Sequence, residues 1–174
     1  MINQIKEDNF DELFAIMEKS FPEDEHRPRD EQKELFENKR YRVYGNTESG
    51  RLSSFIATWE FDDFVFIEHF ATHPEFRNRG LGKIMLEHLK SIYQKPLCLE
   101  VEIPDGELQR RRVTFYERNG FTLNHFPYIQ PPISKGKKPV PLMIMTTGGA
   151  LTDMSFMSIK RTLYREVYKA DPNQ

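Results

Sequence analysis

Apolar residues recur along this chain with two different spacings, which divide it into helices and strands. The three-to-four-residue spacing of an amphipathic helix runs from Phe10 to Phe21 and from Leu81 to Ile92. Tyr41–Tyr44 and Leu52–Phe61 are instead rich in aromatic and β-branched residues, and the turn residues of Gly45–Gly50 lie between them. This second pattern predicts a β-hairpin.

The same criteria predict the remaining elements. Further strands are expected at residues 2–5, 64–72, 97–103, 121–129 and 140–147, and further helices at about 30–38, at 107–118 and in the final segment. The order β-α-α-β-β-β-α-β-α-β-β-α predicts a mixed α/β (α+β) fold in which antiparallel strands precede a strand-helix-strand unit. No repeat or linker interrupts the chain, so we expect residues 1–174 to form one domain, with residues 150–174 as an appended C-terminal helix.

Four apolar residues of the final segment fall on one helical face, namely Phe156, Ile159, Leu163 and Val167. An apolar helical face has to be buried, either on the domain's own sheet or against a second copy of the chain. Because this helix follows a complete set of strands, we expect it to form a homodimer contact, with packing on its own domain as the alternative.

Composition and charge narrow the kinds of function. The chain has 174 residues, close to the size of one domain, and its formal charge of -2 gives no positive field that would attract nucleic acid or anionic lipid. It has neither a secretory leader nor a bilayer-spanning apolar segment, so we expect a cytoplasmic protein without nucleic-acid or membrane partners. The lone Cys98 lies in an apolar run and is expected to be a buried strand residue. The histidines lack metal-ligand spacing, so no metal site is predicted.

The most informative stretch runs from Phe64 to Leu89, where a strand leads through a basic loop into a helix. Gly80 and Gly82 lie at the start of that helix, so unpaired backbone N–H groups can converge on a phosphate without side chains in the way. Three basic side chains can add charge-assisted contacts to phosphate oxygens: Arg77, Arg79 and Lys83. The alternative is a helix start that binds no ligand, in which the glycines only add flexibility and the arginines are solvated. Because glycine inside a helix costs about 1 kcal/mol relative to alanine, two of them in one turn favour phosphate binding.

The same stretch resembles the core motif of the GNAT family of acyl-CoA-dependent N-acyltransferases. That motif has Arg or Gln, two residues, Gly, one residue, and then Gly or Ala. Arg77, Gly80 and Gly82 match it in order and spacing, and His73–Phe76 resembles the approach to it. Thr114–Phe121 resembles the family's later helix end, and the resemblance covers residues 2 to about 147. A P-loop or a dinucleotide fingerprint would need residues that are absent from this stretch.

The resemblance implies a fold and a cosubstrate. A GNAT fold has a mixed, mostly antiparallel central sheet flanked by helices, and its members bind acetyl-CoA. Backbone groups near Phe70 and Thr72 would pair with the pantetheine arm, and Gln109 stands where family members often have an asparagine beside it. The CoA pyrophosphate would be held by N–H groups of the turn residues Arg79, Gly80, Leu81, Gly82 and Lys83.

Acyl transfer to an amine needs a base, because an alkyl amine with a pKa of about 10.4 is neutral in only roughly one molecule in two thousand at pH 7. Glu68 is the first candidate, since it interrupts an apolar strand, and the adjacent His69 is the second. Strand alternation sends these two side chains to opposite faces unless a bulge intervenes. Either residue could instead lie on a solvated face of the sheet.

Tyr116 is the candidate general acid that returns a proton to the departing CoA thiolate, a role that the resemblance of its segment implies. The alternative is a half-buried aromatic side chain that packs the helix on the sheet. The resemblance also implies that a backbone N–H near Phe70 stabilises the oxyanion of the thioester.

Three functions follow from these observations. The first is an N-acetyltransferase that moves an acetyl group from acetyl-CoA to a primary amine of a small molecule or protein, by direct attack on the thioester. The second is a non-catalytic acyl-CoA-binding sensor or interaction module, and the third is a different phosphate-ligand protein. The acceptor would be selected by the loops Phe21–Arg29 and Gln130–Pro139, whose sequences do not name it.

Overall fold

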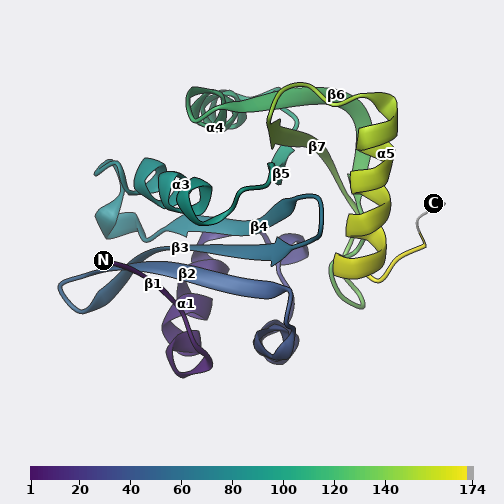
Figure 1. Ribbon diagram of the computed structural model, residues 1–174. Coiled ribbons are helices and arrows are strands. Elements are labelled where there is room, and N and C mark those ends of the chain that lie inside the picture. Colours follow the sequence, from purple (N-terminus) through teal and green to yellow (C-terminus); the bar gives the residue numbers. More distant parts are fainter. Residues whose placement is uncertain (172–174) are drawn as a thin grey trace. The chain divides into compact units, whose positions relative to one another are not determined.

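The computed structural model describes residues 1–171 and divides the chain into two compact units, residues 1–97 and residues 98 onward (Figure 1). The strands and helices follow the order expected from the sequence, and the paired strands are antiparallel. The predicted fold class, a mixed α/β fold with mostly antiparallel strands flanked by helices, is therefore confirmed. That the two units act as a single domain stays a prediction.

The N-terminal unit is built on a sheet in which each strand pairs antiparallel with the next. In sheet order the strands are β1 (Ile2–Gln4), β2 (Tyr41–Glu48), β3 (Arg51–Glu60) and β4 (Val65–Thr72). The β2-β3 hairpin turns at Ser49 and Gly50, whose φ angles are 51° and 77°. A two-residue turn with both φ angles positive matches the twist of paired strands. Because the turn is this short, β2 extends to Glu48, into the segment Gly45–Gly50 that the sequence predicts as a turn.

Helices cover both faces of this sheet. Helix α1 (Phe10–Ser20) packs on one face and α3 (Leu81–Ile92) on the other (Figure 1). Strand β3, between them, is buried at every position from Leu52 to Trp59. The predicted bounds of both helices are confirmed to within one residue, because their apolar faces are long and regular.

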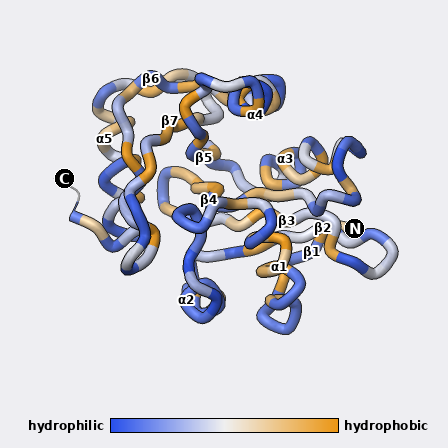
Figure 2. Tube along the Cα trace, turned by 180° about the vertical axis from the view of Figure 1, so that it is seen from behind, coloured by the Kyte–Doolittle hydropathy of each residue, from blue (hydrophilic) through white to orange (hydrophobic). Residues whose placement is uncertain are grey.

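Short helical turns connect these elements. The charged helix predicted at about 30–38 is a six-residue helix, α2 (Arg29–Glu34), of which Gln32 is buried. Figure 2 shows α2 as hydrophilic along most of its length, in contrast to the apolar residues on the neighbouring strands. The remaining turns of this unit are η1 (Glu7–Asn9), η2 (Glu23–Glu25), η3 (Leu35–Glu37) and η4 (Pro74–Phe76).

The C-terminal unit has a sheet in which β7 lies between β5 and β6 and is antiparallel to both. Its strands are β5 (Leu97–Glu102), β6 (Phe121–Gln130) and β7 (Val140–Thr147). Helix α4 (Glu107–Arg118) precedes β6. As predicted, it closes at Asn119 and Gly120, where the Gly120 N–H donates to the Glu117 carbonyl at 3.0 Å and φ is 83°.

The last helix, α5 (Asp153–Thr162), continues through a π-helical turn, η5 (Leu163–Val167). Its predicted apolar stripe is 4 % exposed at Phe156 and fully buried at Leu163 within the single chain. The Phe156 ring stacks on Phe126 of β6 with centroids 4.4 Å apart, and the Tyr164 hydroxyl donates to the Ile129 carbonyl at 2.5 Å. β6 of the same unit therefore covers Phe156 of this stripe, which is the alternative that the sequence left open, and the homodimer stays a prediction.

Cys98 lies fully buried on β5, as its apolar neighbours predict. Burial raises the pKa of its thiol, which keeps the side chain protonated and unreactive at neutral pH. Within residues 1–171, no helix combines the length and the apolar character that crossing a membrane would require.

Candidate active site

The turn before α3 has the backbone conformation that an anion site at a helix start requires. Gly80 is the N-cap of α3 and adopts φ 75°, and its carbonyl accepts from the Ile84 N–H at 3.2 Å. The N–H groups of Leu81, Gly82 and Lys83 consequently have no acceptor within the helix. A Cβ built on Gly80 would meet no atom within 4 Å apart from its neighbours in the chain, so there is room for a side chain at this position. Glycine is needed there for its positive φ rather than for close packing.

The His-Pro-Glu-Phe sequence before the turn forms η4. Pro74 occupies its first position, where a missing N–H costs nothing, and the Glu75 N–H donates to His73 Nδ1 at 3.3 Å. The Phe76 ring is buried and lies edge-on to the His73 ring, with centroids 5.8 Å apart. These contacts fix the path by which β4 leads into the turn.

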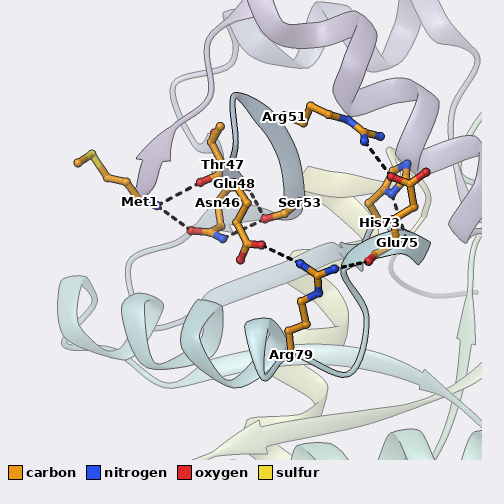
Figure 3. A network of polar contacts seen from close by, with 9 residues as sticks. All are labelled: Met1, Asn46, Thr47, Glu48, Arg51, Ser53, His73, Glu75 and Arg79. Carbon is orange, nitrogen blue, oxygen red and sulfur yellow. Dashed lines mark hydrogen bonds and ion pairs between the residues drawn. The ribbon is translucent and has the colours of Figure 1, made fainter.

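Two arginines of the turn contact oxygens of the same unit, and Figure 3 shows the contacts of one of them, Arg79. The Arg79 guanidinium donates to the Glu75 carbonyl at 3.1 Å, lies 3.5 Å from the Glu48 carboxylate and sits over the Phe76 ring. The Arg77 side chain donates to the Thr72 carbonyl at 3.3 Å. All these groups are exposed enough to exchange partners, and their contact with a phosphate, like that of the exposed Lys83, stays a prediction.

Strand β4 carries a bulge at Glu68. Ala57 of β3 pairs with His69 and Thr58 pairs with Ile67, which leaves Glu68 as an extra residue. Simple alternation would send Glu68 and His69 to opposite faces, but the bulge brings both side chains into one buried cluster. Each side chain is 2 % exposed, and Glu68 Oε2 lies 3.4 Å from His69 Nδ1. Beyond the bulge, Phe70 and Thr72 are half-buried and regularly paired with β3.

The segment Phe21–Arg29 supplies the partners of both side chains. Arg27 Nη1 lies 2.8 Å from Glu68 Oε1, and the Arg27 side chain is 5 % exposed. His69 Nε2 donates to the Glu25 carbonyl at 2.8 Å, since a carbonyl oxygen only accepts. The Phe21 ring lies edge-on to the His69 ring at 4.8 Å. From the sequence alone this polar loop could equally have been solvated. The role of Arg27 was not predicted, because no residue near it in the sequence is its partner.

The Glu68 carboxylate is held in its charged form. Burial opposes ionisation, but the Arg27 guanidinium and the His69 side chain outweigh it and lower the pKa of Glu68 to about 2. Tyr41 of β2 is affected by the same carboxylate, because burial and the Glu68 charge raise the pKa of its phenol. The Tyr41 hydroxyl also accepts a hydrogen bond from Gln32 Nε2 at 2.8 Å. The cluster is thus a buried ion pair surrounded by hydrogen-bonding groups.

Tyr116 and Gln109 belong to the C-terminal unit, where both lie on α4. The Tyr116 ring is 8 % exposed and packs edge-on against Phe115 and Phe121, with centroids 5.2 and 5.5 Å away. Burial raises the pKa of Tyr116 to about 12, with Arg112 opposing the shift. Its phenol therefore keeps its proton at neutral pH. Gln109 is half-exposed in the first turn of the helix.

One carboxylate of β5 was missed by the sequence analysis. Glu100 accepts hydrogen bonds from the hydroxyls of Tyr128 and Tyr168, the latter at 2.6 Å. The signal that could have found it is a charged residue between Leu99 and Val101 in an otherwise apolar strand. Its tyrosine partners come from β6 and from beyond α5, so no local pattern predicts them.

Comparison with known proteins agrees with this geometry. Residues 10–121 match the model of the acetyltransferase (GNAT) family. A solved candidate acetyltransferase of the GNAT family from Bacteroides thetaiotaomicron is 32% identical, with a TM-score of 0.87 over 98% of this chain and 99% of that one. A 64-residue stretch is 36% identical to YjbC, a candidate acetyltransferase of Bacillus subtilis (strain 168), and covers 36% of this chain but only 33% of YjbC.

A more distant neighbour adds a ligand. The PaiA N-acetyltransferase of Thermoplasma acidophilum, solved in complex with coenzyme A, has a TM-score of 0.57 over 84% of this chain and 97% of that one. At 15% identity this likeness shows the fold alone. Because the family model spans most of the chain and the relative from Bacteroides matches nearly all of it, the chain belongs to the acetyltransferase (GNAT) family.

Proposed function

We propose that this protein is an N-acetyltransferase that moves an acetyl group from acetyl-CoA to a primary amine of a small molecule or protein. The observation that carries the proposal is the helix start at Gly80, whose first N–H groups have no acceptor within the helix and lie at its positive dipole end. That feature follows a strand with a bulge in a chain of the acetyltransferase (GNAT) family. A fold neighbour solved with coenzyme A supports the choice of cosubstrate.

The residues that the family resemblance marks would hold acetyl-CoA. The N–H groups of the turn residues Arg79–Lys83 would bind the pyrophosphate, with Arg77, Arg79 and Lys83 adding charge after exchanging their present partners. By the family resemblance, backbone groups of β4 at Phe70 and Thr72 would pair with the pantetheine arm, and Gln109 of α4 would lie near it. A thioester supplies a carbonyl that an amine can attack directly.

The protein's contribution to the reaction is mostly placement. Holding an amine in line with a thioester can supply on the order of 7 to 11 kcal/mol of the barrier. A backbone N–H near Phe70 would stabilise the oxyanion that forms, as the family resemblance implies. Tyr116 would donate its proton to the departing thiolate, a role that suits a phenol whose pKa of about 12 keeps it protonated.

The two predicted bases, Glu68 and His69, are poorly placed to take a proton from the amine directly. A carboxylate with a pKa near 2 is a weak proton acceptor, so the contacts of Glu68 count against a direct role. His69 is buried, and one of its nitrogens is engaged by the Glu25 carbonyl. Amine molecules that bind already neutral need no base at all.

Thiol release from acetyl-CoA, measured across a panel of primary amines, tests the proposal. We expect amine-dependent release together with an acetylated product that is 42 Da heavier by mass spectrometry, the mass gain that acetylation of an amine requires. A protein that binds coenzyme A in calorimetry but releases no thiol with any amine would instead be a sensor. Displacement of coenzyme A by ATP at similar concentration would indicate a general phosphate-ligand protein.

A further inference from the structure

Glu68 and His69, the two candidate bases on β4, are also the residues that contact the segment Phe21–Arg29. The Phe21–Arg29 segment contacts the bulge at three points: the Phe21 ring on His69, the Glu25 carbonyl on His69 Nε2, and the Arg27 guanidinium on Glu68. Each contact ends on Glu68 or His69. The bulge makes this possible, since only an extra residue lets neighbouring side chains serve the same buried cluster.

The cluster is closed to a substrate. The side chains of Glu68 and His69 are 2 % exposed and that of Arg27 is 5 % exposed. His69 Nε2 carries a hydrogen toward the Glu25 carbonyl, and Nδ1 faces Glu68. An acceptor amine could reach neither nitrogen without first displacing the segment.

We propose that Glu68 and His69 are positioning residues, which anchor the Phe21–Arg29 segment beside the reacting part of β4, and that neither takes a proton from the acceptor. This inference rests on the proposed function, which puts the thioester near Phe70, the residue next to His69. The segment then forms one wall of the space through which an amine approaches that strand. Loosening it weakens acceptor binding and leaves the chemical step largely intact.

The variants separate charge from volume. Glu68→Gln keeps the size of the side chain but leaves the Arg27 charge buried without its carboxylate, so it can fail to fold. The double variant Arg27→Met/Glu68→Gln removes both charges and keeps the site filled. For the histidine, His69→Gln retains an N–H donor for the Glu25 carbonyl, whereas His69→Ala does not. Lys33→Met, which breaks the exposed ion pair with Glu7, is the matched control outside the cluster.

Steady-state kinetics give the first readout. In the double variant and in His69→Ala we expect the KM for the amine to rise about tenfold or more, with kcat and the KM for acetyl-CoA changing less than about fivefold. His69→Gln should recover most of the wild-type KM, and the acidic limb of the pH-rate profile should keep its midpoint in every variant. A kcat loss of about 100-fold or more with a vanished acidic limb, in either the double variant or His69→Gln, would make that residue the base and overturn the proposal.

Hydrogen exchange of the protein without ligands gives a second readout that does not depend on activity. Amides of residues 21–29 should exchange at least about tenfold faster in the double variant and in His69→Ala than in the wild type or in Lys33→Met. Unchanged protection of the segment would show that it is not anchored by these residues, whatever the kinetics. If the wild type acetylates no amine, the proposed function fails, while faster exchange would still establish the anchor.

Discussion

The turn before α3 and the bulge of β4 lie in the same unit and in adjoining stretches of sequence, yet they are built differently. The first N–H groups of the turn have no acceptor within the helix, and the Arg79 side chain makes an ion pair that is open to solvent. The bulge turns a carboxylate and an imidazole inward, where a buried arginine and a backbone carbonyl occupy them. One region has backbone donors that no acceptor in the helix uses, and the other has side chains that are already paired.

The difference shows how well a reactive side chain in the sequence predicts a catalytic role. A backbone site depends on φ angles, which glycine permits and which a local motif can specify. The chemistry of a side chain depends on the groups that face it. The partner of Glu68 is Arg27, which lies about forty residues earlier in the sequence. Reactive residue types at a plausible position are therefore weaker indicators than a backbone conformation that only glycine adopts easily.

The largest effect expected from this contrast is on stability, in a pair of arginine variants. Arg27→Ala leaves the buried Glu68 charge with His69 alone beside it and should lower the free energy of unfolding by about 3 to 5 kcal/mol. Arg79→Ala removes an exposed ion pair and should cost less than about 1 kcal/mol. Urea unfolding of both variants at neutral pH measures the difference. Equal losses would mean that the cluster and the turn do not differ as their burial indicates.

The pH dependence of stability should carry the signature of the same pair. The pKa of Glu68 falls from 4.5 to about 2 on folding, so its stabilisation is complete above pH 4.5 and is lost as the pH falls toward 2. This change corresponds to about 3 kcal/mol. Between pH 5 and 2 the wild type should lose about that much more stability than the Arg27→Met/Glu68→Gln variant, which lacks both charges. Parallel curves from thermal unfolding would show that Glu68 is not held ionised by its partners.

Much of the fold could be predicted because it depends on local periodicity. The helices at 81–92 and 107–118 have the predicted bounds, since an apolar face and a glycine or proline boundary mark each one. The extent of β2 could not be predicted, because Ser49 adopts the positive φ of a tight turn without being glycine. The bulge of β4 was only a possibility in the sequence, since Phe64–Thr72 reads as one regular strand.

The site was predictable to the extent that it is local. The turn at Gly80 follows from spacing and from the conformational freedom of glycine. The partners of Glu68, His69 and Glu100 come from distant segments, and a single sequence does not show which distant residues meet. For the same reason the apolar stripe of α5 suggested a second copy of the chain, although β6 of its own unit covers Phe156 of that stripe.

Tyr116 tests whether a buried side chain of this protein can act on a ligand. It is buried like Glu68 and His69, but we propose that it donates a proton to the departing thiolate. Tyr116→Phe keeps the ring packed on Phe115 and Phe121 and removes the proton donor. We expect kcat to fall about 100-fold while acetyl-CoA affinity stays within about twofold, as for loss of a general acid. Steady-state kinetics and calorimetry on the same preparation decide. Full turnover would assign the ring to packing alone.

The smallest expected effect tests the turn itself, through two substitutions at Gly82. This residue lies in the first turn of α3, where its N–H is one of the groups that have no acceptor in the helix. Valine should weaken acetyl-CoA binding by about tenfold or more, which corresponds to about 1.4 kcal/mol, because a branched side chain would stand where the pyrophosphate approaches the backbone. Alanine is the matched control, since the motif that this turn resembles accepts it and it favours the helix by about 1 kcal/mol over glycine. Calorimetry with acetyl-CoA should therefore separate the two variants while thermal unfolding finds both folded. Equal affinity of wild type, Gly82→Ala and Gly82→Val would place the pyrophosphate away from this turn, and the contrast between a backbone site and a paired side-chain cluster would no longer describe how the protein binds its cosubstrate.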